Sequence, residues 1–488
     1  MRTRGAGLSI SIPLIAAIVI GVLFFACSKQ TKPSPPTNKQ SPVIHAFLNN
    51  ILQDWEGQKD FSAEFEKLTG TKLQITQPPH QNYMERVFLS LSSDMVPDII
   101  EVLPEYLPRL IQTGTIIPLD SFISKSSNLQ SVDSRFLDPL RNPDGQLYAF
   151  PARDGGGCIT YIRQDWLDNL GLPIPETWAE LVRVMEAFTF DDPDGNGIND
   201  SYGYTDVAAA SQDWYNRLIF GEGRVEIYWD EPEGRWVDGL TRPATQAALI
   251  RLKELYDRGI IDPAIPTNTT YAARTKFING QAGIFTYWAN HWARNLQDRT
   301  EAASSPAARI LPLPAPRGVR YIRRIPPVLV ISAAATDPAF VFEHMIDRQY
   351  DKGPVQTLFT LGVKGIHWDL KDGRISFLPN PLDPFQADYT KAYVPPGSQI
   401  NDWELPLELD PLVGKALEIF RRNPSEDRQK WGGEFFSQYH QEIEQVLKPD
   451  IMSSYLAGDR DLTEAMELYR REAARLYLDE ILNELNGS

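Results

Sequence analysis

Residues 43–50, VIHAFLNN, begin the stretch of sequence that decides the fold class. They predict a short apolar strand that ends in polar residues. Apolar residues then recur at helical spacing up to Gly70, which is placed to end a helix. The segments TKLQIT (71–76) and VPDIIEVL (96–103) predict two further strands. Strands that alternate with helices indicate an α/β fold with a parallel sheet covered on both faces. Ligands of such sheets bind at the carboxyl ends of the strands.

A second region of the same kind begins near Tyr148. There, YAFPARDGGGCITYIRQDWL (148–167) runs from a strand through a glycine-rich bend into another strand and a helix. Thr177 and Glu180 are spaced as a capping box for the helix that follows. The apolar stripe of that helix is predicted to be core and consists of Trp178, Leu181, Val182, Met185 and Phe188.

Two features predict two lobes: the length of the chain, and a late strand pattern that follows a proline-rich segment. A single core seldom organises as many as 488 residues. The proline-rich LPLPAPRG (311–318) precedes PPVLVISAAA (326–335), a strand that takes the chain back to lobe one. A last amphipathic helix is predicted from Asp461 to Leu485. We expect lobe one to comprise residues 43–152 and 316–365, and lobe two residues 153–315 and 366–488.

The N-terminus has the layout of an export signal. Two arginines precede an apolar run over residues 8–26, and Cys27 stands where that run stops. The next residues, SKQTKPSPPTNKQSP (28–42), are polar and proline-rich. This layout is similar to a bacterial lipoprotein signal, which implies that residues 1–26 are removed, that Cys27 is lipidated and that residues 27–42 are a flexible linker. The alternative is an uncleaved membrane anchor, because the run is long enough to span a bilayer. In both cases we expect the lobes outside the cytoplasm, on the membrane surface.

The composition argues against some classes of function. The formal net charge of −16, together with the lack of a basic tract, argues against a nucleic-acid partner. With 42% hydrophobic and 11% aromatic residues, the chain can bury sizeable cores. Cys27 and Cys158 are the two cysteines, so lipidation of Cys27 leaves no pair for an intramolecular disulfide. We expect Cys158 to be a small core residue.

Eight stretches, in order along the chain, carry a resemblance to a known family. They are EFEKLTGTKLQIT, VPDIIEV, TGTIIPLDSFI, DGQLYAFP, YIRQDWLDNLGLPIPETWAEL, DDPDGNGINDSYGYT, FINGQAGIF and TLGVKGIHW. They resemble the extracellular solute-binding lipoproteins of carbohydrate ABC importers, in particular the subgroup that includes alginate-binding proteins. The resemblance implies a two-lobed, periplasmic-binding-protein-like α/β fold with hinge-linked lobes and a ligand cleft between them. It also implies a monomer that is not an enzyme but captures a sugar or oligosaccharide for the permease subunits of an ABC importer.

Residues 192–200, DPDGNGIND, reproduce the first nine positions of an EF-hand calcium loop. Gly197 falls at the sharp turn of such a loop. The predicted oxygen ligands of a Ca²⁺ ion are Asp192, Asp194, Asn196, the carbonyl of Ile198, and Asp200. Position twelve is Gly203 rather than a bidentate glutamate, and Ser201 stands where relatives in the family often have Glu. The alternative is an acidic surface turn. The resemblance favours calcium in a structural role, away from the sugar.

Candidates for the solute cleft are aromatic residues in polar contexts and polar residues near strand ends. The tryptophans are Trp55, Trp214, Trp288, Trp292, Trp368 and Trp403. For each of them a packing role stays open beside a stacking role, and we expect two or three stacking platforms. The polar candidates are Asn50, Arg153, Asp154 and His367, and Arg153 alternatively cross-links the hinge. A uronate ligand would require several arginines to converge. The overall acidity favours a neutral glycan.

Two other classes of function remain as alternatives. A secreted glycosidase needs two carboxylates across a sugar subsite, and with 64 Asp and Glu residues the presence of such a pair decides nothing. The sequence contains no G-x-S-x-G, H-E-x-x-H or P-loop motif, and its six histidines are scattered. The second alternative keeps the fold but binds a peptide or another solute, or acts as a sensor.

Overall fold

The computed structural model describes residues 42–487 except for 50–54, 94, 152–153, 208–212, 214, 216–220, 222, 381–382, 388–399 and 423. The chain divides into two compact units, residues 1–40 and 41–488, and all described residues belong to the second. Among these residues, no helix combines the length and the apolar character needed to cross a membrane. The predicted signal, Cys27 and most of the predicted linker lie outside the described residues.

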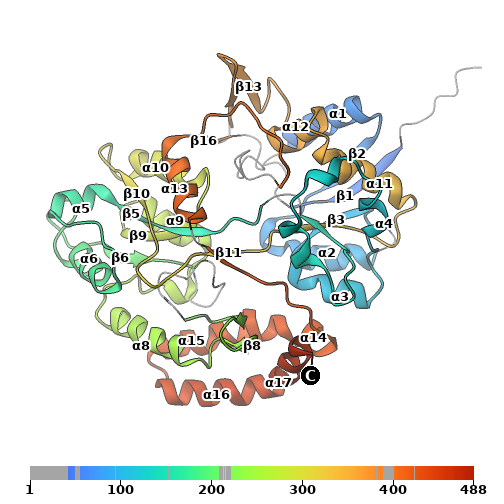
Figure 1. Cartoon of the computed structure of the whole chain (residues 1–488). Coiled ribbons are helices and arrows are strands. Elements are labelled where there is room, and N and C mark those ends of the chain that lie inside the picture. The colour runs from blue at the N-terminus through green and yellow to red at the C-terminus, as the bar shows by residue number, and fades with distance from the viewer. Residues whose placement is uncertain are drawn as a thin grey trace, which may run out of the picture. The chain divides into compact units, whose positions relative to one another are not determined.

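A five-stranded sheet forms the core of the first lobe, in the order β2-β1-β3-β12-β4 (Figure 1). Its parallel strands are β1 (Val43–Phe47), β2 (Lys72–Thr76) and β3 (Ile99–Val102), as the alternating pattern predicts. The other two strands, β12 (Val328–Ile331) and β4 (Phe150–Pro151), form antiparallel pairs with β3 and β12 respectively. The three strands that the sequence predicts are therefore parallel, and β12 runs antiparallel to its neighbours β3 and β4. β12 belongs to the chain returning from the second lobe, and it enters the sheet in the opposite direction.

Helices pack their apolar residues against this first sheet. Phe61 and Phe65 of the first helix are fully buried, and both meet Phe359 edge-on, with ring centroids 5.3 and 6.0 Å apart. The helices of this lobe are α1 (Trp55–Thr69), α2 (Tyr83–Leu91), α3 (Leu107–Gln112), α4 (Asp120–Ile123), α11 (Pro338–Met345) and α12 (Pro354–Leu361). Ile400 also belongs to this core, which therefore extends past the predicted lobe boundary at residue 365.

A four-stranded sheet in the order β10-β5-β9-β6 forms the centre of the second lobe. Its strands are β5 (Cys158–Arg163), β6 (Tyr202–Thr205), β9 (Ala282–Trp288) and β10 (Ile310–Leu313). β5 is antiparallel to both β9 and β10, and β6 is parallel to β9. Cys158 is fully buried in this sheet, as predicted, and burial raises the pKa of its thiol well above the ordinary value.

Helix α6 (Trp178–Phe190) begins with the predicted capping box of Thr177 and Glu180. Met185 and Phe188 on its predicted stripe are fully buried, and Phe188 meets Trp166 of α5 (Gln164–Leu170) edge-on at 5.2 Å. The remaining helices of this part are α8 (Pro243–Asp257), α9 (Thr270–Ile278) and α10 (Trp292–Ala303). The antiparallel hairpin of β7 (Ile227–Asp230) and β8 (Arg235–Asp238) directly precedes α8 in the chain.

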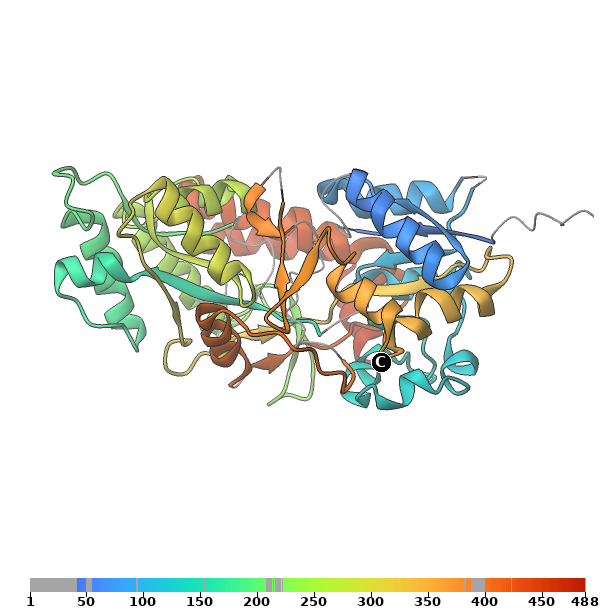
Figure 2. The ribbon, with the colours of Figure 1, turned by 90° about the horizontal axis from the view of Figure 1, so that it is seen from above.

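The chain ends in a group of helices, which Figures 1 and 2 show in red. They are α14 (Glu434–Glu442), α15 (Lys448–Ala457), α16 (Leu462–Arg475) and α17 (Leu478–Asn486). Helix α13 (Pro411–Arg421) precedes them in the chain and packs instead against β5, β10 and α10 of the second lobe (Figure 1). A single π-helical turn, Ile443–Leu447, joins α14 to α15. The prediction of one continuous helix from Asp461 to Leu485 was wrong, because Tyr477 takes a left-handed conformation (φ 57°) between α16 and α17.

Candidate functional site

Polar side chains of the first lobe meet at the carboxyl ends of β1 and β3. Asn49 follows β1, and its side-chain oxygen lies 3.0 Å from Nδ1 of His80. The Glu101 carboxylate accepts a 3.4 Å hydrogen bond from the backbone N–H of Asn49. The Tyr83 hydroxyl lies 2.8 Å from the Phe47 carbonyl oxygen and 2.7 Å from the Glu101 carbonyl oxygen, so its single proton is shared between the two strand ends. This is the edge at which an α/β sheet binds its ligand.

The second lobe presents aromatic rings at the end of β9. Trp288 is half-buried, and Tyr215 meets its ring edge-on with a centroid distance of 6.4 Å. Arg324 stacks on Trp288, with its guanidinium carbon 4.7 Å from the ring centroid. A guanidinium over an indole face is the favourable cation–π geometry. Trp288 is therefore the tryptophan of the predicted set that the structure places beside charged and aromatic groups at a strand end.

Arg324 connects the two lobes electrostatically. It follows β11 (Ile322–Arg323) in the segment that leads back to the first lobe. Burial lowers the pKa of His80, and the positive charge of Arg324 lowers it further. Arg324 also opposes the rise that burial causes in the pKa of Glu105. Sequence reasoning missed Arg324, although the paired arginines before Pro326 and Pro327 mark a strand that leaves one lobe for the other.

Asp154 lies in the crossing between β4 and β5 and binds Arg323. Nη1 of Arg323 donates to both carboxylate oxygens of Asp154, at 2.7 and 2.8 Å. The two side chains are only 11% and 19% exposed, and Arg323 also reaches Glu426 at 3.2 Å. At Gly155 the crossing segments approach so closely that a Cβ atom would lie 1.7 Å from the Arg324 carbonyl oxygen. The predicted candidate Asp154 thus ties together two segments that run between the lobes.

Three other predicted candidates are packed inside the protein. Trp292 is 8% exposed and meets Tyr287 edge-on at 5.0 Å. His367 is fully buried, and its Nδ1 accepts a 2.7 Å hydrogen bond from the Val363 N–H. Trp368 is 8% exposed, and its indole N–H donates to the Gly362 carbonyl at 2.9 Å. Cations lie over both tryptophan rings, with the Arg274 guanidinium carbon 4.7 Å from the Trp292 centroid and the Lys364 ammonium 5.8 Å from the Trp368 centroid.

The remaining cleft candidates lie at the edge of the described residues or outside them. Trp403 is half-buried beyond Ile400. Trp55 is the first residue of α1, but its side chain is outside the described part of the chain. The predicted candidates that lie wholly outside it are Asn50, Arg153 and Trp214.

The predicted calcium loop follows α6 and is held by its own side chains. Asp192 accepts hydrogen bonds from the backbone N–H groups of Asn196 (3.0 Å) and Gly197 (2.8 Å). Asn196 accepts one from the Ile198 N–H (2.7 Å) and donates to Asp194 (3.1 Å). Burial raises the pKa of Asp194, and the negative charges of Asp200 and Asp192 add to the rise. The loop therefore carries negative charge that its hydrogen bonds do not fully offset.

Two features of the loop bear on metal binding. In the described part of the chain, no three or more His, Cys, Asp or Glu side chains are grouped so that they could hold a metal ion. Two of the five predicted donors, the Asn196 amide oxygen and the Ile198 carbonyl oxygen, do not belong to His, Cys, Asp or Glu side chains. Gly203, at the twelfth position, lies so close to α6 that a Cβ atom would be 2.5 Å from the Met185 carbonyl oxygen. A bidentate glutamate therefore cannot occupy that position.

Comparisons with known proteins agree with this architecture. The sequence profile of the family described as bacterial extracellular solute-binding protein matches residues 56–344. Lipoprotein LipO of Bacillus subtilis (strain 168) is 26% identical over 400 residues, which cover 76% of each chain. The polygalacturonan/rhamnogalacturonan-binding protein YtcQ of the same organism is 25% identical over 420 residues, or 81% of this chain and 78% of YtcQ.

Among solved structures, the alginate-binding protein AlgQ2 without calcium ion has a similar fold. Its TM-score is 0.68 at 17% sequence identity, and the similarity covers 92% of this chain and 98% of AlgQ2. At this identity the similarity concerns the fold alone, and it agrees with the two-lobed α/β architecture described above.

Proposed function

The chain belongs to the family of bacterial extracellular solute-binding proteins, and from this membership we propose that it captures a sugar or oligosaccharide and delivers it to an ABC-type importer. It binds this solute without changing it chemically. The observation that carries the proposal is the position of Arg324. Its charge acts on His80 at the strand ends of the first lobe, and its guanidinium stacks on Trp288 of the second.

A polar solute gains from a site of this kind. Sugar hydroxyls lose their hydration on binding and need donors and acceptors in return. The first lobe supplies Asn49, His80 and Glu101, and the second supplies aromatic rings. Closure of hinge-linked lobes brings both sets around one ligand. YtcQ and AlgQ2 are named for binding polygalacturonan/rhamnogalacturonan and alginate, and so support a glycan as the solute of this chain.

We propose that the protein is a monomer tethered to the outer face of the cell membrane through a lipid on Cys27. The apolar run that stops at Cys27 and the polar linker after it support this proposal. The similarity to Lipoprotein LipO is a second, independent support.

We propose that Ca²⁺ binds the loop of residues 192–200 in a structural role. The ion would be held by the side chains of Asp192, Asp194, Asn196 and Asp200 and by the carbonyl of Ile198. The donors fit by chemistry, because calcium takes six to eight oxygen ligands. The negative charges of Asp192 and Asp200 beside Asp194 support the proposal as well, since a cation would offset them. The loop then fixes the connection between α6 and β6.

A thermal-shift and calorimetric screen of the purified full-length protein tests the proposed function. The panel contains neutral oligosaccharides, acidic oligosaccharides and short peptides. Since a ligand that binds only the folded state raises Tm, we expect a rise with at least one glycan and none with peptides. A rise with peptides alone, or release of shorter sugars from a bound glycan, would contradict the proposal.

A further inference from the structure

His80 lies at the carboxyl edge of the first-lobe sheet, the edge at which such a sheet binds its ligand. It begins a 3-10 turn (His80–Asn82) that follows β2 and leads into α2. Its Nδ1 lies 3.0 Å from the side-chain oxygen of Asn49, which follows β1. The backbone N–H of Asn49 in turn donates to Glu101 of β3 at 3.4 Å. Groups from neighbouring strands therefore orient the ring of His80.

The contact with Asn49 decides which ring nitrogen of His80 carries the proton. An amide oxygen can only accept a hydrogen bond, so Nδ1 of the neutral ring is the donor and Nε2 is an acceptor. Within the part of the chain that the structure describes, Nδ1 is the ring nitrogen of His80 that has a hydrogen-bond partner. The side chain is exposed to solvent, so a hydroxyl group of a solute can reach Nε2 and donate to it.

The charges around His80 favour the neutral ring. Desolvation by the surrounding segments lowers its pKa below the ordinary value of 6.5, and the positive charge of Arg324 lowers it further. The negative charge of Glu101 acts in the opposite direction and is the weaker influence. Tyr83 of α2 adds no charge, because burial raises the pKa of its hydroxyl. An imidazolium at this place therefore depends on the water that hydrates it.

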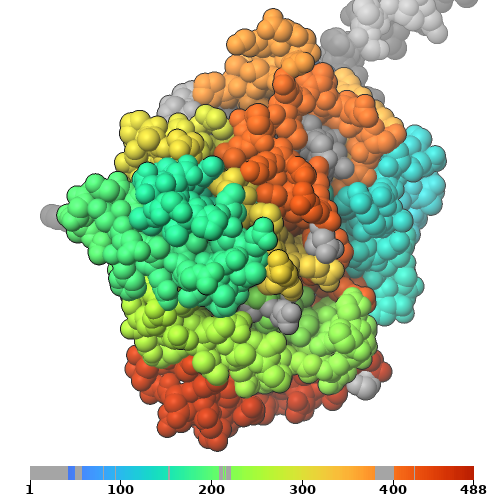
Figure 3. All heavy atoms as spheres, turned by 60° about the vertical axis from the view of Figure 1, so that its left-hand side comes forward, coloured from blue at the N-terminus to red at the C-terminus, as the bar shows by residue number. Residues whose placement is uncertain are grey.

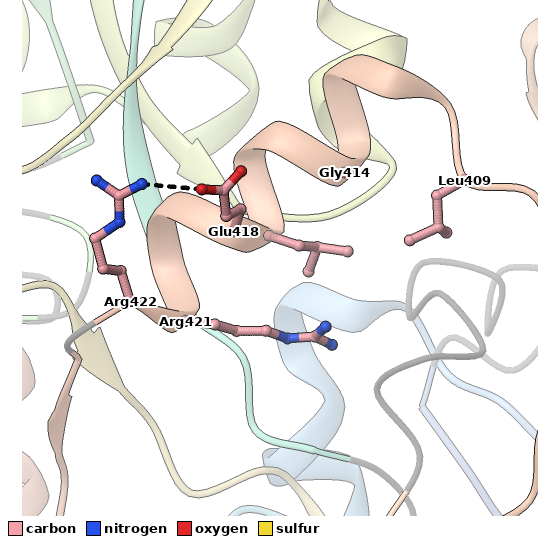
Figure 4. A pocket seen from close by; sticks show the side chains of 6 residues that line it. Leu409, Gly414, Glu418, Arg421 and Arg422 are labelled. Atoms are coloured by element: carbon pink, nitrogen blue, oxygen red, sulfur yellow. Dashed lines mark hydrogen bonds and ion pairs between the residues drawn. The ribbon is translucent and has the colours of Figure 1, made fainter.

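The pocket of about 460 Å³ against α13 offers no equivalent to this neutral acceptor. Figure 3 shows α13 and the residues before it, in orange, at the surface of the molecule. Glu418 of the pocket is bonded to Arg422 at 2.9 Å, and Arg421 points away from that pair (Figure 4) and has an interaction of its own. A sugar hydroxyl would have to compete with these contacts. His80 is the better partner for an uncharged hydroxyl.

We propose that His80 recognises a sugar hydroxyl through its neutral Nε2, so that the protein holds its solute at neutral pH and releases it in acidic surroundings. This inference rests on the proposed function and names the regulation of its binding site. Protonation turns Nε2 from an acceptor into a donor and places a second positive charge beside Arg324. A bound solute also displaces the water that would hydrate the imidazolium. Proton and solute therefore compete, and the affinity falls as the pH drops below the pKa of His80 in the free protein.

Calorimetry on the full-length protein between about pH 8 and about pH 5 tests the proposal. The probes are maltotriose, raffinose and oligogalacturonate, none of which changes its charge greatly above about pH 5, so that a pH dependence comes from the protein. We expect the affinity for at least one probe to stay constant above about pH 6.5. Below that, it should fall by up to about tenfold for each pH unit, the limit for the exclusion of one proton.

Two variants of His80 separate its charge from its hydrogen bond. His80→Gln keeps an acceptor oxygen and cannot be protonated, so its affinity should stay within about fivefold at about pH 8 and lose the dependence on pH. His80→Lys carries a lasting positive charge and should bind about tenfold or more weakly at both ends of the range. The matched control is His45→Gln, at an exposed histidine of β1, which should keep the full pH dependence.

NMR of the histidine ring protons gives a second measurement, in which the His80→Gln spectrum identifies the signal of His80. The pKa of His80 should lie below 6.5 in the free protein and fall further with the bound probe. An equal pH dependence in the unaltered and His80→Gln proteins, an affinity that rises on acidification, or a His80 signal that the probe does not shift would overturn the inference and leave the proposed function standing. If no probe binds at any pH, the proposed function fails together with the inference.

Discussion

Arg324 and Trp288 form a stacked pair, with the guanidinium carbon of Arg324 4.7 Å from the centroid of the indole ring. Arg324 belongs to the segment that returns to the first lobe, whereas Trp288 ends β9 of the second lobe. The pair therefore joins the segment that leads back to the first lobe to the end of β9 in the second lobe.

The Trp288→Ala variant should bind the glycan found in the screen about tenfold more weakly, because it loses both the ring and its cation–π contact with Arg324. Calorimetry on the full-length protein measures the effect. Trp178→Ala is the matched control, since Trp178 is a half-buried tryptophan on α6 that contacts Arg251. An equal loss in both variants would show that Trp288 serves the fold rather than the ligand.

The Asp154→Asn variant should lower the free energy of unfolding by about 1–3 kcal/mol, because it weakens a charged hydrogen bond in a largely buried setting. Arg323 keeps its contact with Glu426, which limits the loss. Urea unfolding measures the change. The exposed pair of Arg135 and Asp133 provides the control, and Asp133→Asn should cost less than about 1 kcal/mol. Unchanged stability of Asp154→Asn would exclude a role for this contact at the crossing.

Lys448 is fully buried between Asp238 and Glu444, at 2.9 and 2.8 Å, and also donates to the Val225 carbonyl at 2.8 Å. Lys448→Met leaves two buried carboxylates without their cation, so we expect a loss of about 3–5 kcal/mol in the free energy of unfolding. Lys67→Met, which removes an exposed partner of Glu64, should cost under about 1 kcal/mol. A loss in Lys448→Met as small as that of the control would contradict the structure.

Asp206 predicts a pH dependence of stability. Burial raises its pKa to about 8, so the folded protein holds a proton that the unfolded chain releases above its ordinary pKa near 3.8. The folded state binds more protons between these values, and stability therefore falls as the pH rises from about 4 to about 8. Asp206→Asn should flatten this slope in urea titrations across that range. Asp459→Asn, at an exposed position, should leave the slope as it is.

Removal of calcium should lower Tm if the loop of residues 192–200 holds an ion. We expect EDTA to lower Tm, and excess Ca²⁺, but not Mg²⁺, to restore it. The Asp192→Asn variant should show a low Tm that EDTA does not change further. An EDTA-insensitive Tm in the unaltered protein would count against the calcium proposal.

Much of the fold follows from local patterns, and the exceptions have identifiable causes. The strands at Val43, Lys72 and Ile99 and the capping box of Thr177 depend on neighbouring residues, so the sequence predicts them. The direction of β12 depends on the path of the chain through the other lobe, which no local pattern encodes. The residue at the break, Tyr477, is neither Gly nor Pro. The amphipathic pattern of the sequence therefore continues across it and predicts a single helix.

The candidate site was harder to predict than the fold. Trp288 and Trp292 lie four residues apart in the same polar stretch, yet one is half-buried at a strand end and the other begins a helix that packs on Tyr287. Their difference arises from the turn between β9 and α10, not from their neighbours in sequence.

The glycine at position 155 sets a limit on how this protein can diversify. Every other amino acid has a Cβ atom, and here that atom would lie 1.7 Å from the Arg324 carbonyl oxygen. Substitution would force apart the two segments whose side chains, Asp154 and Arg323, are bonded across the crossing. Positions without such a clash can change, but position 155 must stay glycine for the two segments to pass this closely. A sensor engineered from this protein should therefore take its reporter elsewhere and leave this crossing untouched.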